Sequence, residues 1–129
     1  MSLTGRLGMN KQIYFLDTYA FFEIIRGNPN YKKYTQIKAV TTIFNIAELN
    51  YNLKKEKSKK LADKITKKYY PMVISVNFDD IKKAMNLKIE RKEMSIPDVI
   101  GYIVAEHMGI KFLTGDEDFR GMKNVEFVK

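Results

Sequence analysis

Apolar residues along the chain fall into two patterns, short continuous runs and sets spaced three to four residues apart. The continuous runs predict buried strands, and the spaced sets predict helices that bury one face. The predicted strands are residues 13–16, 39–42, 72–76, 110–114 and 125–128. The predicted helices are residues 18–26, 31–37, 42–56, 57–70, 77–94 and 95–108. Short strands that alternate with helices are typical of an α/β domain built on a mainly parallel sheet.

The stretch from Ser95 to Phe119 has the clearest pattern. Ser95 is a suitable N-cap, Pro97 fits the first helical turn, and Gly109 is suited to the helix end. Apolar residues cover most of the helix between these ends, which predicts a buried helix: Val99, Ile100, Ile103, Val104 and Met108. An apolar strand and a Gly-Asp-Glu-Asp turn follow. Carboxylates therefore stand at both ends of an apolar unit, Asp98 at its start and Asp116 and Asp118 at its finish.

Length and composition indicate one domain of residues 9–129 with a sizeable core, since 45% of the 129 residues are hydrophobic. Residues 1–8 differ from the rest, and we interpret them as a cloning remnant or a disordered lead. There is no cysteine, which excludes disulfides and thiolate zinc sites and suits a reducing cytoplasm. No run of 18 apolar residues or signal-peptide pattern occurs, so we expect a cytoplasmic protein with no membrane span.

The net charge of +8 is unevenly divided. Five acids stand at positions where a site is expected: Asp17, Glu48, Asp98, Asp116 and Asp118. Without them, the remainder has 23 basic and ten acidic side chains, a balance of +13. A basic body around an acidic spot suits a polyanion bound outside and metal ions held within. A basic soluble protein with no such ligand is the alternative, and charge alone does not decide between them.

Four of these carboxylates are expected to meet at one edge of the sheet. Asp17 ends the first strand and Asp116 follows the strand 110–114, and the carboxyl ends of parallel strands form the edge where ligands bind. Glu48 lies in the helix after the second strand, and Asp98 lies in the first turn of the buried helix. Carboxylates packed together repel unless cations neutralise them, and such oxygen ligands select Mg²⁺ or Mn²⁺.

Each acid also has a simpler explanation. Asp17 can cap the helix that follows it, and Asp98 can act as a first-turn partner of its own helix dipole. Asp116 and Asp118 can be turn formers. Glu48 lies inside an apolar run, where a glutamate needs a partner. Because an acid recurs at each position expected to face the cleft, the set together favours a site.

Other features favour structural roles. Residues 54–68 hold eight lysines, which can follow phosphates but more often form a solvated helix face. The tyrosines and phenylalanines are assigned to the core, and His107, the single histidine, is expected to pack in its apolar helix. One histidine excludes RNA cleavage by paired histidines. The GxxxxGK[ST], GxGxxG and GxSxG signatures are absent from the sequence.

Three segments carry a family resemblance: FLDTYAF around Asp17, NIAEL around Glu48, and SIPDVIGYIVAEHMGIKFLTGDEDF around Asp98 and Asp116. Over Gln12 to Lys129 the chain resembles a PIN domain and is most similar to the stand-alone ribonucleases of VapC-type toxin–antitoxin pairs. The final TGDEDF is its most specific part. Four acids match the family's acidic positions: Asp17, Glu48, Asp98 and Asp116. Neighbouring positions match as well: Thr18, Thr114 and the additional acid Asp118. Tyr19 departs from the serine that is more usual there.

The resemblance implies a three-layer α/β/α sandwich and Mg²⁺- or Mn²⁺-dependent cleavage of RNA by a metal-activated water. It implies metal roles for Asp17, Asp98 and Asp116, with Glu48 holding a second metal or orienting the water and Asp118, Thr18 and Thr114 supporting them. It also implies a homodimer and an antitoxin partner. Open alternatives are a PIN nuclease that acts on DNA or in ribosomal RNA processing, and a non-catalytic nucleic-acid-binding module. A receiver-like phospho-acceptor domain would need an acidic pair before the end of the first strand, and the sequence has none there.

Overall fold

A five-stranded parallel sheet forms the centre of the computed structural model, which describes residues 12–129. The strands are β1 (Ile13–Leu16), β2 (Lys38–Thr42), β3 (Val73–Ile74), β4 (Lys111–Thr114) and β5 (Val125–Phe127). Their order is β3-β2-β1-β4-β5, and all four pairings are parallel. The expected mainly parallel sheet is confirmed. The interpretation of residues 1–8 lies outside the described residues.

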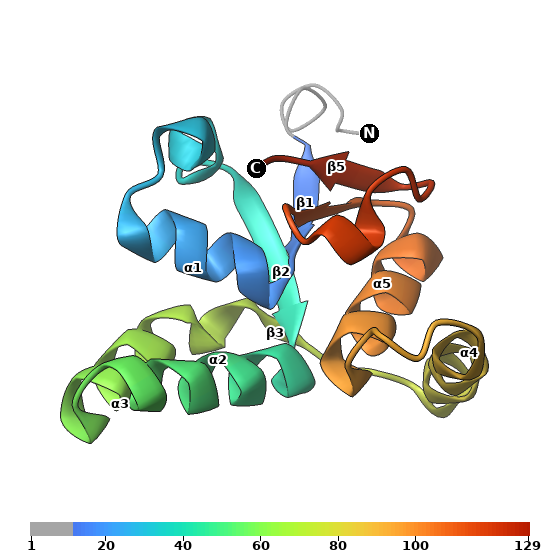
Figure 1. Ribbon diagram of the computed structural model, residues 1–129, viewed down its shortest axis with the longest axis horizontal. Helices are drawn as coiled ribbons and strands as arrows, with labels where there is room; N and C mark the ends of the chain where they lie inside the picture. Colours follow the sequence, from blue (N-terminus) through green and yellow to red (C-terminus); the bar gives the residue numbers. More distant parts are fainter. Residues whose placement is uncertain (1–11) are drawn as a thin grey trace, which may run out of the picture.

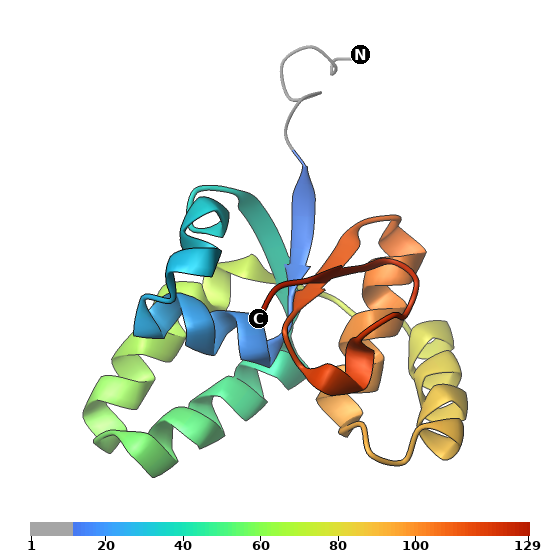
Figure 2. The same cartoon turned by 45° about the horizontal axis from the view of Figure 1, so that its top comes forward.

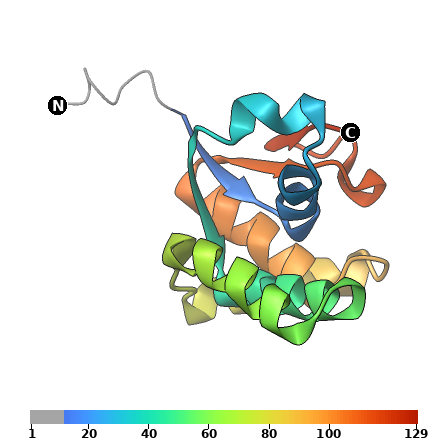
Figure 3. The same ribbon diagram turned by 90° about the vertical axis from the view of Figure 1, so that its left-hand side faces the viewer.

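Helices cover both faces of the sheet, as Figures 1 and 2 show. On one side of β1 lie α1 (Thr18–Arg26), α2 (Ile43–Glu56) and α3 (Lys59–Tyr69). On the other side lie α4 (Phe78–Glu90) and α5 (Ile96–Met108). The helices α2 and α3 pack as a hairpin, which is clearest in Figure 3. This arrangement is the expected three-layer α/β/α sandwich. Within residues 12–129, no helix is both long and apolar enough to cross a membrane.

Alternation along the two central strands gives each face of the sheet its own core. Leu16 of β1 and Leu113 of β4 belong to the core shared with α1, α2 and α3. Phe15 and Phe112 point to the opposite face, where they stack at 5.6 Å between ring centroids and pack against α4 and α5. Neighbouring residues of a strand face opposite ways, so the continuous apolar runs are explained by burial on both faces.

The predicted helix ends are largely confirmed by their caps. The side chains of Asn77 and Ser95 accept hydrogen bonds from the backbone of the first turns of α4 and α5. Gly27 and Gly109 end α1 and α5 with φ of 79° and 70°, the left-handed conformation that favours glycine. Single capping residues therefore determine where these helices begin and end.

Three predicted elements are wrong in type or length. The helix expected at 31–37 is a 3₁₀ helix at Pro29–Tyr34, because Asn28 caps it and Pro29 starts it earlier. The strand expected at 72–76 is only β3, because Tyr70–Met72 form a 3₁₀ turn. The helix expected to reach residue 94 ends at Glu90. The remaining boundaries agree or differ by at most two residues.

The last turn of α5 corrects the expectation for His107. Most residues from Asp98 to Ala105 are buried, but Met108 is 44% exposed and the His107 side chain is 60% exposed. The apolar run is longer than the part of the helix that the sheet and α4 cover. His107 Nδ1 instead lies 2.9 Å from Oδ2 of the buried Asp80, which joins α5 to α4.

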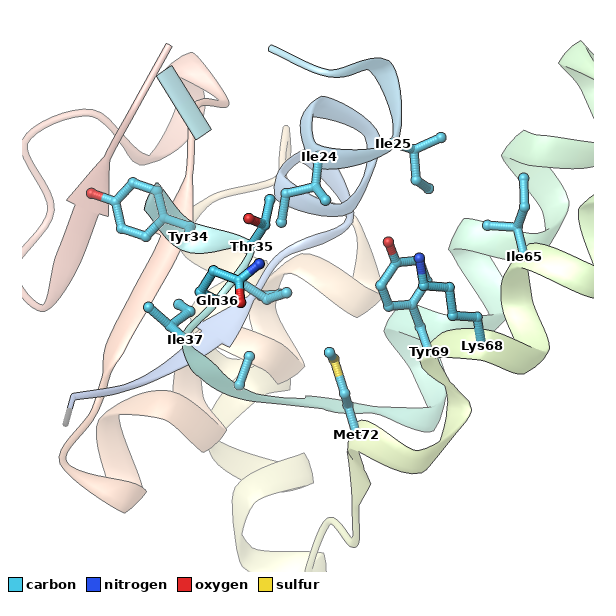
Figure 4. A pocket seen from close by; sticks show the side chains of 12 residues that line it. Ile24, Ile25, Tyr34, Thr35, Gln36, Ile37, Ile65, Lys68, Tyr69 and Met72 are labelled. Atoms are coloured by element: carbon cyan, nitrogen blue, oxygen red, sulfur yellow. The ribbon is translucent and has the colours of Figure 1, made fainter. Parts of the chain in front are cut away.

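An apolar groove of about 580 Å³ lies between α1, α3 and β2, and we call it the α1/α3 groove (Figure 4). Its lining includes Ile24, Ile25, Ile37, Ile65, Tyr69 and Met72. In Figure 4 these side chains surround a common space and come from α1, α3, the 3₁₀ turn Tyr70–Met72 and the residue before β2. The groove has no lining residue in common with the carboxylate cleft described next.

Candidate metal centre

The central strands place two acids at the same edge of the sheet. Asp17 follows β1, and its backbone N–H donates to the carbonyl of Leu113 in β4 at 3.2 Å. Asp116 follows β4 after Gly115. Since β1 and β4 are adjacent and parallel, their carboxyl ends carry Asp17 and Asp116 to one place.

Close packing of α2 and α5 supplies the other two acids. The Asn45 side chain in α2 donates to the carbonyl of Pro97 in α5 at 3.3 Å. Gly101 permits this approach, because a Cβ there would lie 2.8 Å from the Phe15 ring and 3.2 Å from Asn45 Oδ1. Glu48 lies one turn after Asn45 in α2, and Asp98 lies in the first turn of α5. Both residues therefore line the same cleft.

Three of the four predicted metal ligands form a tight cluster. Asp17, Asp98 and Asp116 each offer an oxygen, and these oxygens lie within 4.8 Å of one another. The cleft around them has a volume of about 300 Å³. It is lined by Asp17, Thr18, Tyr19, Phe22, Glu48, Asn52, Glu93, Ser95, Asp98, Asp116 and Asp118. The structure thus gathers all five candidate acids into one depression, with Glu48 and Asp118 beside the cluster.

Asp17 does not cap the helix that follows it. It occupies the N-cap position of α1, but its side chain makes no capping hydrogen bond. Oδ2 instead accepts a 2.7 Å bond from the Thr114 hydroxyl. Oδ1 is the one buried side-chain polar atom in residues 12–129 without a hydrogen-bond partner. A buried carboxylate oxygen without a partner is unfavourable, so a proton or a cation bound at this atom would stabilise the site.

Asp98 and Asp116 do have the local roles suggested as alternatives. Asp98 Oδ2 accepts from the Ser95 backbone at 3.0 Å, and Ser95 Oγ accepts from the Asp98 backbone at 3.2 Å, which completes a capping box. Asp116 Oδ1 accepts from the Asp118 backbone at 3.0 Å. Each such bond uses only part of a carboxylate's acceptor capacity. These bonds therefore fix the orientation of both groups without preventing them from binding a cation.

Glu48 is held by two hydroxyl groups. Thr18 Oγ1 donates to its Oε1 at 2.7 Å, and Ser95 Oγ donates to its Oε2 at 3.3 Å. The expectation that this glutamate needs a partner is confirmed, although the side chain is half-buried rather than enclosed. The hydroxyls of Thr18 and Thr114, both singled out by the resemblance, thus orient Glu48 and Asp17.

Burial and mutual repulsion make the cluster hard to ionise. Burial, the Asp98 charge and the Glu48 charge raise the pKa of Asp17 well above its ordinary value, against the opposing Thr114 bond. Burial, with added repulsion from Glu48 and Asp116, raises the pKa of Asp98 to about 6. Burial followed by the Asp116 charge also raises the pKa of Asp118. A divalent cation among these oxygens would relieve the repulsion, and the donor set fits Mg²⁺ or Mn²⁺.

Sequence patterns did not reveal several residues of the cleft. Asn52 lies one turn after Glu48, a spacing of four that was available as a signal. Glu93 lies in the loop before α5, where no periodicity applies. Arg91 ties this loop together, since it donates to the Asp118 carbonyl at 2.6 Å and to Glu93 Oε2 at 2.7 Å. Such contacts between loops leave no pattern in the sequence.

The fold and the site define a class, the α/β/α sandwich with a carboxylate cluster at the carboxyl edge of a parallel sheet. The sequence profile of the PIN domain matches residues 14–125. The chain therefore belongs to the PIN domain family. No curated protein sequence matches it.

Solved structures share the fold at low sequence identity. A toxin–antitoxin complex from Klebsiella pneumoniae superposes with a TM-score of 0.68 and 18% identity, over 88% of this chain and 95% of that one. VapBC2 from Rickettsia felis, bound to a DNA fragment from its promoter, gives 0.70 and 17%, over 92% and 100%. PAE2754 from Pyrobaculum aerophilum gives 0.68 and 19%, over 91% of each chain.

Proposed function

We propose that this PIN protein is a Mg²⁺- or Mn²⁺-dependent endoribonuclease and the toxin of a toxin–antitoxin pair. One observation carries the proposal: the buried, unpartnered Oδ1 of Asp17 lies in a cluster with Asp98 and Asp116. A cation bound among these carboxylates would relieve their mutual repulsion, and a cation at such an edge suits phosphodiester hydrolysis. Membership of the PIN family and the fold shared with toxin–antitoxin complexes support the same function.

Asp17, Asp98 and Asp116 are the residues that would hold the cation. Bound there, it would supply positive charge beside the phosphate and activate the attacking water. Thr114 fixes Asp17 through its 2.7 Å hydrogen bond, and the capping box fixes Asp98. The ligand set is therefore oriented in advance by bonds to the surrounding fold.

Glu48 would hold a second metal or orient the attacking water. Its two oxygens are held by Thr18 and Ser95 at the wall of the cleft, and a carboxylate retains acceptor sites beyond those two bonds. Asp118 has a supporting role, since its backbone donates to Asp116 and its side chain lines the cleft.

The decisive experiment compares Asp98→Asn with Asp79→Asn on labelled RNA in Mn²⁺. Asp79 is a matched control, because it is also a first-turn aspartate but its side chain is 70% exposed on α4. Asp98→Asn retains the capping oxygen but loses the charge, so we expect the fold to persist and the turnover to fall at least about a hundred-fold. Asp79→Asn should cleave like the wild type.

Unchanged cleavage by Asp98→Asn would refute this mechanism. The same assay on a DNA strand of identical sequence separates the alternatives. Cleavage of DNA as fast as RNA would favour a DNA-directed nuclease. Metal-dependent binding without cleavage of either would favour a non-catalytic module.

A further inference from the structure

One wall of the carboxylate cleft differs in chemistry from the rest. Glu48, Asp98, Asp116, Asp118 and Glu93 make most of the cleft acidic, as the lining shows. The wall formed by α1 instead presents Tyr19 and Phe22, one helical turn apart. Phe22 is only 8% exposed, whereas Tyr19 is partly exposed. Of the two aromatic residues on this wall, Tyr19 is therefore the more exposed.

The Tyr19 ring lies beside the carboxylate cluster. A Cβ on Gly115 would lie 2.4 Å from Tyr19 Cε1, so the ring packs against the bare backbone of that glycine. Gly115 stands between Thr114, which bonds Asp17, and Asp116. The ring thus packs against the residue that directly precedes Asp116, one of the three clustered carboxylates.

Cations accompany the two rings. Lys129 Nζ lies 5.8 Å from the Tyr19 ring centroid and donates to the Gly115 carbonyl at 3.2 Å. The Arg26 guanidinium carbon lies 4.9 Å from the Phe22 ring centroid. Both cations are also ion-paired, Lys129 with Glu117 at 3.2 Å and Arg26 with Glu23 at 3.2 Å. Stacking of an aromatic ring on a base, the interaction that proteins commonly use for single-stranded nucleic acid, is therefore the stronger basis for recognition here.

A purely structural role for Tyr19 explains less. The same helix already supplies Phe21 and Phe22 to the core, and Phe21 is fully buried. Tyr19 packs at the margin of that core and also lines the cleft. Packing against the core therefore accounts for only part of its environment.

We propose that Tyr19 forms a nucleobase subsite, in which an unpaired base next to the cleaved phosphate stacks on the ring. The proposal rests on the proposed nuclease function and names the residue that contacts a base of the substrate. A base within a duplex is already stacked and paired, so it reaches the ring only after both interactions are broken.

The test measures binding and cleavage of a fluorescent single-stranded RNA and of the same strand with an abasic nucleotide beside the cleaved bond. Binding is followed by anisotropy in Ca²⁺ and cleavage in Mn²⁺. The variants are Tyr19→Ala, Tyr19→Leu, which retains apolar packing, and Tyr19→Phe, which retains the ring. Tyr51→Ala is the matched control, because Tyr51 is 63% exposed on α2, lies outside the cleft and also carries a lysine over its ring.

On the intact strand, we expect Tyr19→Ala and Tyr19→Leu to raise Kd and KM about five- to hundred-fold, the range measured for one base–aromatic stack. The Tyr19→Phe and Tyr51→Ala variants should stay within about twofold of the wild type. The wild type should bind the abasic strand as weakly as Tyr19→Leu binds the intact strand. The effects of the substitution and of the missing base on Kd should not add.

If Tyr19→Leu weakens binding equally on the intact and abasic strands, or does not weaken it at all, the subsite is overturned. Cleavage by the wild type would in that case still support the nuclease function. If the wild type cleaves no RNA, the proposed function fails and binding decides the subsite. Base-dependent binding that Tyr19→Leu abolishes supports it, and base-independent binding overturns it.

Discussion

Two buried carboxylates, Asp17 and Asp98, carry most of the electrostatic strain of the site. Asp17 is 1% exposed and Asp98 is 9% exposed, and their charges repel each other. Neither faces a basic side chain within its own set of hydrogen bonds, which come from hydroxyl and backbone groups. Without a metal ion, the site is therefore more stable when one of these carboxylates is protonated than when both are charged.

This strain predicts how stability depends on pH. The pKa of Asp98 is about 6 in the fold against an ordinary value of 3.8, so the folded chain binds a proton between these values that the unfolded chain does not. The stabilisation is thus complete below about pH 4 and is lost as pH rises through 6, with a loss of at most about 3 kcal/mol in the free energy of unfolding.

The measurement is urea unfolding in EDTA from pH 4 to 8 for the wild type and Asp98→Asn. Because other carboxylates titrate in the same range, the difference between the two curves is the informative quantity. Relative to Asp98→Asn, the wild type should lose stability between pH 4 and 6. Parallel curves would show that Asp98 ionises as easily in the fold as in the unfolded chain.

At the scale of the element, the start of α5 links helix stability to the site. Ser95 caps the helix through the Asp98 backbone at 3.2 Å and also donates to Glu48 at 3.3 Å. Ser58 caps α3 in the same way, by accepting from the Leu61 backbone at 3.1 Å, and it lies outside the cleft. Comparing substitutions of the two serines therefore distinguishes the effect of helix capping from the effect of supporting the site.

We predict that Ser95→Ala and Ser58→Ala each lower the free energy of unfolding by about 1 kcal/mol, the usual cost of a lost N-cap. Only Ser95→Ala should also weaken Mn²⁺ binding, because it frees Glu48 Oε2 and loosens the capping box around Asp98. Denaturant unfolding and calorimetric titration with Mn²⁺ measure the two effects. Equal Mn²⁺ affinity in both variants would restrict Ser95 to capping.

Elements with strong local signals were predictable from the sequence. The unit of α5 and β4 combines an N-cap, a terminal glycine and continuous apolar runs, so its boundaries came out within one residue. The length of β3 was overestimated, because MVISV is apolar except for Ser75 but only Val73 and Ile74 pair with β2. Pairing depends on where the neighbouring strand ends, and periodicity does not contain that information.

The acids of the site were predictable for a topological reason, since they follow strands or begin helices that meet at one sheet edge. Their individual contacts were not. That Asp17 leaves its helix uncapped and bonds Thr114 instead depends on the adjacency of β1 and β4. The exposure of His107 likewise depends on how far α4 and the sheet extend along α5.

At the scale of the whole molecule, the chain presents two separate concave surfaces. The carboxylate cleft is acidic, while the α1/α3 groove is largely apolar and has Lys68 at its edge. They share α1, which contributes Tyr19 and Phe22 to one and Ile24 and Ile25 to the other. A partner bound in the groove would therefore contact the helix that forms one wall of the cleft.

The α1/α3 groove is a suitable binding surface for the proposed antitoxin. The homodimer is a separate prediction, which light scattering can test. We predict that Ile65→Asp abolishes co-purification with the small protein of an adjacent gene, since a carboxylate in an apolar interface is left unpaired. Ile89→Asp, at a 72% exposed site on α4, is the matched control and should leave the complex intact. Ile65 lies outside the cleft, so free Ile65→Asp should still cleave RNA, and cleavage should no longer be inhibited by the partner. Retention of the complex by Ile65→Asp would move the partner's binding surface elsewhere on the molecule.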